Sequence, residues 1–78
     1  MKTTKYFEAT RCRPDRAGIR DEWIIRAIER PEHEHIQKDN RLRRWARIPE
    51  AENRYLRVIL LPDRETVHNA FFDRGFKP

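Results

Sequence analysis

The segment Arg41–Ile48 has the pattern of residues that most clearly suggests chemistry. Successive side chains of a strand point to opposite faces, so Arg43, Trp45 and Arg47 would lie on one face. Guanidinium groups bind phosphate through paired N–H donors, and an indole can stack on an unpaired base. The alternation therefore predicts a nucleic-acid-binding strand face. Its members would be Arg41, Arg43, Trp45 and Arg47, with Leu42, Arg44, Ala46 and Ile48 on the other side.

The alternative is the reversed orientation of this strand, with Trp45 in the core. Arg44 would then be buried, which is costly unless its guanidinium is paired. We also expect Arg57, on the neighbouring strand, to extend the cationic face.

His68 is the candidate for proton transfer, because a neutral imidazole can accept and donate protons at about pH 7. In RNA cleavage one group takes a proton from a 2′-hydroxyl, another protonates the leaving oxygen, and cations stabilise the phosphorane. We expect His68 to be the acid or base, with Glu34 or Glu52 as alternative bases. Arg43, Arg57 and Arg74 are the candidate phosphate ligands. The alternative is that His68 only forms hydrogen bonds within the sheet.

The His33-Glu34-His35 motif would place two imidazoles on one face of a strand. Two ligands are too few for a metal site, and the only other histidine and thiol are His68 and Cys12. We therefore favour a solvated edge strand and predict neither a metal nor another cofactor.

The charge balance indicates a polyanionic partner. The 78 residues contain 18 Lys and Arg against 13 Asp and Glu, a net charge of +5. The excess is concentrated in 10–20 and 38–57, and such basic patches favour phosphates through counterion release. Arginine outnumbers lysine fourteen to four, which suits phosphate recognition but would also follow from a GC-rich genome.

Several classes of protein are disfavoured by what the sequence lacks. It has a single cysteine, two glycines, no Gly-rich phosphate loop and no Cys-x-x-Cys motif, so ATPases, dinucleotide enzymes and zinc ribbons are not expected. No apolar run is long enough to span a membrane, and we expect a cytoplasmic protein.

The pattern of elements predicts one α+β domain over 1–78, with an antiparallel sheet of four to five strands and one main helix on one face. The expected order is β-α-β-β-β-β. The helix is predicted over Glu22–Arg30, where apolar residues recur at helical spacing and Pro31 follows. Strands are expected over Lys5–Thr10, His33–Lys38, Arg41–Ile48, Tyr55–Leu61 and Thr66–Phe72. The tail from Asp73 to Pro78 is expected along the sheet edge.

The stretch 53–72, Asn-Arg-Tyr-Leu-Arg-Val-Ile-Leu-Leu-Pro-Asp-Arg-Glu-Thr-Val-His-Asn-Ala-Phe-Phe, resembles the closing hairpin of the RelE/ParE/BrnT-like plasmid toxin superfamily. With the preceding helix and basic strand, the resemblance covers roughly 20–74. It implies a toxin of a toxin–antitoxin pair that cleaves mRNA, often on the ribosome and without metal. The matching positions would be Arg43, Trp45, Arg47, Arg57, His68 and Arg74. The chain differs from many relatives in having one predicted helix before the sheet.

Three hypotheses follow from these patterns. The first is a toxin-like endoribonuclease with an acidic antitoxin-like partner. The second is a non-catalytic module that binds nucleic acid or an acidic protein. The third is an interaction protein whose basic face is covered by a second copy in a homodimer.

Overall fold

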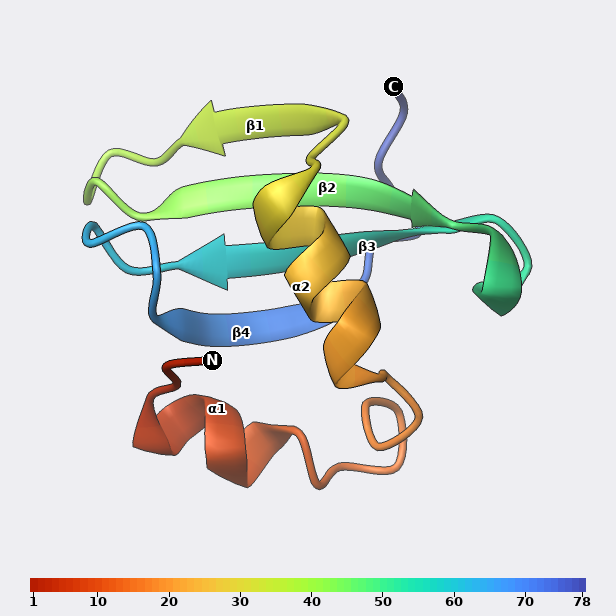
Figure 1. Cartoon of the computed structure of the whole chain (residues 1–78), viewed down its shortest axis with the longest axis horizontal. Helices are drawn as coiled ribbons and strands as arrows, with labels where there is room; N and C mark the ends of the chain where they lie inside the picture. The colour runs from red at the N-terminus through yellow and green to blue at the C-terminus, as the bar shows by residue number, and fades with distance from the viewer.

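A four-stranded antiparallel sheet is the centre of the computed structural model, which describes residues 1–78. Its strands follow each other in chain order as β1-β2-β3-β4. One helix, α2, lies across one face of the sheet, and a second, α1, lies beside β4 (Figure 1). The predicted α+β class with an antiparallel sheet is therefore confirmed. The strands are β1 (His33–Ile36), β2 (Leu42–Ile48), β3 (Arg54–Leu60) and β4 (Val67–Phe72), with the short 3-10 helix η1 (Pro49–Ala51) after β2.

The first element is a helix, α1 (Lys5–Thr10), so the expectation of a strand there is wrong. Thr4 caps this helix, because its hydroxyl accepts a hydrogen bond from the Phe7 amide at 3.0 Å. Phe7 is buried while Tyr6 is exposed, a difference between neighbours that occurs in strands as well as in helices. The strand-like pairing falls just before the helix, where Thr3 forms a parallel bridge to β4.

The second helix, α2 (Asp21–Glu29), agrees within one residue at each end with the predicted one. Asp21 and Glu22 occupy its first turn, where negative charge stabilises the positive end of the helix dipole. Ile24 and Ala27 are buried, and the helix contacts β2 and β3. This helix therefore covers the face of the sheet that carries the core.

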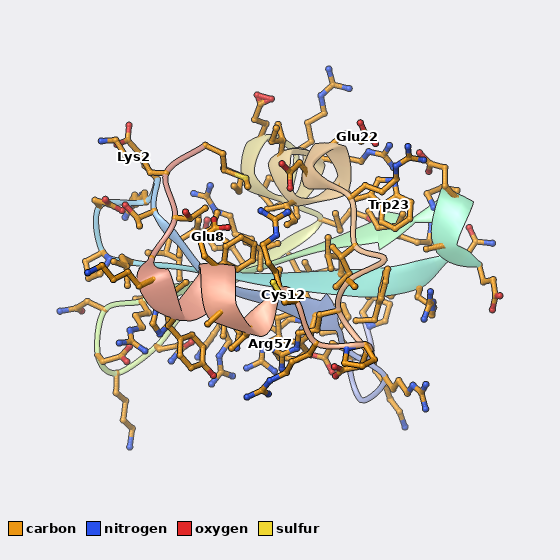
Figure 2. All side chains as sticks on the ribbon, turned by 90° about the horizontal axis from the view of Figure 1, so that it is seen from below. Lys2, Glu8, Cys12, Glu22, Trp23 and Arg57 are labelled. Atoms are coloured by element: carbon orange, nitrogen blue, oxygen red, sulfur yellow. The ribbon has the colours of Figure 1, made fainter.

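The register of the sheet fixes which side chains lie together, because directly paired residues of an antiparallel sheet share a face. Trp45 of β2 pairs with Arg57 of β3, which pairs with Phe71 of β4. On the other face Leu42 pairs with Leu60, and both belong to the core. Figure 2 shows Arg57 on the opposite side of the sheet from Trp23 of α2. The predicted alternation along β2 is therefore confirmed.

The core lies between the sheet and the helices, and it contains 13 buried residues. They are Phe7, Ile19, Ile24, Ala27, Leu42, Ala46, Ile48, Ala51, Leu56, Val58, Leu60, Val67 and Ala70. Burial of this apolar surface is the main favourable contribution to folding in a chain of this size.

Arg44 is the charged side chain that β2 directs toward α2, and it is only 15% exposed. Its Nε donates to Glu34 Oε2 at 2.6 Å, and its Nη1 donates to the Ile28 carbonyl at 2.8 Å. These bonds offset the cost of burying the guanidinium and tie the end of α2 to β1 and β2.

The C-terminal segment 73–78 does not follow the sheet edge as expected. It turns under the sheet and crosses the face opposite α2 (Figure 1), where Phe76 stacks on Trp45. Neither helix has the length and apolar character needed to cross a membrane.

Candidate nucleic-acid interface

We call the face of the sheet opposite α2 the open face. Two of its rows run across all four strands: His33, Trp45, Arg57 and Phe71, and then His35, Arg43, Ile59 and Asn69. Arg47 and Tyr55 form a further pair beside the first row. The open face therefore combines guanidinium groups with aromatic rings, which are the two side-chain types that bind unpaired nucleic acid.

The two predicted cations within β2, Arg43 and Arg47, keep most of their hydrogen-bonding capacity. Arg43 donates one bond, from Nε to Gln37 Oε1 at 3.0 Å, and has no acidic partner. The Arg47 side chain is exposed and forms no ion pair, whereas Arg41 lies 3.6 Å from the Asp39 carboxylate. Arg43 and Arg47 are thus available to an anionic ligand, whereas Arg41 is already paired with the Asp39 carboxylate.

Trp45 lies on the predicted face, but its indole is not free. The residue is 7% exposed because the ring of Phe76 stacks on it, with centroids 4.7 Å apart and planes inclined by 15°. The indole Nε1–H donates to Asp73 Oδ2 at 3.0 Å. The tail therefore holds the indole through both its ring face and its polar edge.

Arg57 lies beside Trp45, and the carboxylate of Asp73 partly neutralises its charge. Its Nη1 lies 3.3 Å from Asp73 Oδ2, and its guanidinium carbon lies 5.6 Å from the Trp45 ring centroid and 5.2 Å from that of Phe71. Burial opposes the ionisation of Asp73, but the bond from Trp45 and the charge of Arg57 outweigh it and lower the pKa of Asp73. The Nε of Arg57 is buried and has no hydrogen-bond acceptor.

Arg16 also belongs to the candidate site, although no sequence pattern indicates it. It lies between α1 and α2, yet its Nη1 reaches Asn69 Oδ1 at 2.6 Å and its guanidinium carbon lies 5.3 Å from the Phe71 ring centroid. Its Nε, like that of Arg57, is buried without an acceptor. The basic composition of 10–20 was the only signal, and it does not indicate which arginine turns toward the sheet.

His68 lies at the β4 edge of the sheet, beside α1. The register between β3 and β4 shifts at this point, so His68 is the extra residue of a β-bulge, a feature that redirects a side chain. Its Nδ1 lies 3.1 Å from Thr4 Oγ1, and its ring stacks on that of Tyr6 at 4.8 Å. Burial and, next, the charge of Arg41 lower the pKa of His68, so the neutral imidazole is favoured.

The other predicted catalytic residues do not gather around His68. Arg57 is occupied by Asp73, and Arg74 follows β4 at the opposite end from His68. Of the alternative bases, Glu34 is paired with Arg44 on the helix side, and Glu52 is exposed in the turn after η1. The cation that acts on His68 is instead Arg41.

The two histidines of β1 both face the open side, as their pairing with Trp45 and Arg43 requires. His33 contacts the Phe76 ring edge-on at 5.1 Å. No group of three or more His, Cys, Asp or Glu side chains comes together in a way that could hold a metal ion.

Comparisons with protein families, with curated proteins and with solved structures found no match for this chain.

Proposed function

We propose that this chain binds single-stranded RNA on its open face and cleaves it beside His68, as a toxin-like endoribonuclease. The observation that carries this proposal is the position of an imidazole with a lowered pKa at the edge of a face that carries unpaired arginines.

The binding part of the proposal is supported by charge and geometry. Arg43 and Arg47 lie on the same face of β2, and neither guanidinium is paired with a carboxylate, so both can bind phosphates of one RNA strand. The stacked rings of Trp45 and Phe76 lie between them, and unpaired bases bind by stacking of this kind. Bases in a duplex are already stacked on each other, which favours a single-stranded ligand.

The cleavage part of the proposal assigns His68 the role of general base. If Nδ1–H donates to the Thr4 hydroxyl, the lone pair of Nε2 is free. Nε2 then takes the proton of a ribose 2′-hydroxyl, the 2′-oxygen bonds to the adjacent phosphorus, and the bond from phosphorus to the 5′-oxygen breaks. The leaving oxygen takes a proton from the imidazolium or from water. The products are a 2′,3′-cyclic phosphate and a 5′-hydroxyl end.

In this scheme Arg41 and Arg43 stabilise the charge on phosphorus. Arg41 is close enough to lower the pKa of His68, and Arg43 lies on the adjacent row of the open face. An acidic antitoxin-like partner would suit this chain, because its net charge is +5.

A second candidate function is RNA binding without cleavage. It is favoured by the separation of the predicted catalytic residues, since Arg57 is held by Asp73 and Arg74 lies at the far end of β4 from His68. In this case His68 would be a structural residue that joins β4 to α1.

The test uses purified protein and a labelled single-stranded RNA, with binding and cleavage measured separately. Arg43→Ala should weaken RNA binding. It should also reduce the slope of log affinity against log salt concentration by about 1. The matched control is Arg30→Ala, which removes an exposed arginine next to α2. It should change neither the RNA affinity nor its salt dependence.

His68→Ala should keep RNA affinity and reduce cleavage by about 100- to 10,000-fold, as expected for loss of a general base. Binding without 5′-hydroxyl products in the wild type would select the non-catalytic function. Absence of salt-dependent binding would contradict both functions.

A further inference from the structure

The C-terminal segment covers the part of the open face best suited to a nucleotide. Phe76 lies parallel to the Trp45 indole at 4.7 Å, which is the arrangement of a base stacked on an aromatic side chain. The ring of Tyr55 lies on another side of Phe76 at 5.1 Å, and that of His33 at 5.1 Å. Three aromatic side chains of three strands thus surround one planar ring.

Asp73 supplies the anion beside this ring. One carboxylate oxygen, Oδ2, accepts from the Trp45 indole at 3.0 Å and from Arg57 at 3.3 Å. The other, Oδ1, accepts from the Gly75 amide at 3.1 Å. The side chains of Asp73 and Arg57 are 15% and 19% exposed, so the ion pair is largely shielded from water. A phosphate oxygen presents the same acceptors to the same donors.

We propose that Trp45 and Arg57 form a one-nucleotide subsite, and that Phe76 and Asp73 fill it in the free protein as stand-ins for a base and its phosphate. A single-stranded RNA displaces the segment 73–78 and takes its place. This inference rests on the proposed RNA binding and adds to it a defined base position and a cover that the ligand must remove.

The cover is attached in a way that permits displacement. The Asp73 amide donates to the Tyr55 carbonyl at 2.9 Å, but no backbone hydrogen bond joins the residues after Asp73 to any strand. The Phe76 amide donates to Asp73 itself at 3.4 Å. A surface hollow of about 270 Å³ lies beside the tail, lined jointly by tail residues and the ends of β3 and β4. Phe76 and Asp73 therefore provide most of the attachment.

The experiment compares the wild-type chain of residues 1–78 with Phe76→Ala and Asp73→Asn, using fluorescence anisotropy of a labelled oligouridine. Loss of one aromatic stacking contact from the cover should tighten RNA binding by about two- to tenfold. Pro78→Ala is the matched control, because this terminal residue is exposed and lies beyond the contacts described. Far-UV circular dichroism establishes that each variant is folded.

A second measurement needs no variant. In the wild type the Gly75 amide resonance, which reports its bond to Asp73, should move toward its random-coil position as RNA is added. If the wild type binds RNA but Phe76→Ala binds equally or more weakly, and Gly75 does not move, the subsite and its cover are refuted while RNA binding stands. If neither the wild type nor any variant binds RNA, the proposed function itself has failed.

Discussion

The imidazole of His68 is held by the hydroxyl of Thr4, with Nδ1 and Oγ1 3.1 Å apart. The same hydroxyl accepts the Phe7 amide and so caps α1. One side chain near the N-terminus therefore begins a helix and orients the histidine of the last strand. This double role links the stability of α1 to the geometry of the proposed catalytic group.

Thr4→Val should remove both hydrogen bonds while preserving the shape of the side chain. Loss of the cap alone should lower the free energy of unfolding by about 1 kcal/mol, measured in urea. RNA cleavage should also fall while RNA affinity is unchanged, because the imidazole loses its orientation. Thr4→Ser is the control, since it retains the hydroxyl, and a Thr4→Ser protein as impaired as Thr4→Val would show that the hydrogen bonds are not responsible.

The lowered pKa of His68 predicts a pH dependence of stability. Burial and the charge of Arg41 bring the pKa below its ordinary value of 6.5. Between the two values the unfolded chain binds more protons than the folded one, so the free energy of unfolding should decrease as pH falls below about 6.5. Cleavage should decrease at lower pH, as the pH approaches the lowered pKa of the folded imidazole, because only there does the base become protonated.

His68→Gln should remove this part of the pH dependence in denaturation curves, whereas replacing the exposed His35 by Gln should keep it. If the free energy of unfolding of His68→Gln still decreases as the pH falls below about 6.5, another group causes the effect.

The sequence predicted the sheet well because its signals are local and repetitive. Alternation along β2 identified the face of Arg43 and Arg47, and the apolar run of β3 identified an interior strand. α1 was mistaken for a strand because a six-residue segment is too short to display helical periodicity, and only the cap at Thr4 distinguishes it.

The candidate site was harder to predict, because its defining contacts join residues far apart in sequence. Arg16 reaches Asn69 across 53 positions, and Asp73 reaches Trp45 across 28. Neither contact leaves a spacing pattern. The burial of Trp45 likewise depends on the path of the tail, which no periodicity indicates.

Because the core is small, we expect a cavity in it to lower the free energy of unfolding strongly. Leu56 has no exposed surface, and Leu56→Ala should lower the free energy of unfolding by about 2–5 kcal/mol. Since a core of this size supplies only about 3–5 kcal/mol, much of the variant should be unfolded at room temperature. Ile36→Ala, at a residue that is 52% exposed, should change stability by about 0.5 kcal/mol or less in the same urea titration. Comparable losses in both variants would contradict the assignment of the core.

Inducible expression in a bacterial host, with mapping of RNA 5′-hydroxyl ends, tests most directly whether the open face binds and cleaves RNA. The wild type should arrest growth and create new 5′-hydroxyl ends. His68→Ala and Arg43→Ala should accumulate as folded protein without either effect, and Arg30→Ala should behave as the wild type. Normal growth without new ends, in cells that contain folded wild-type protein, would contradict cleavage and leave the open face as a binding surface.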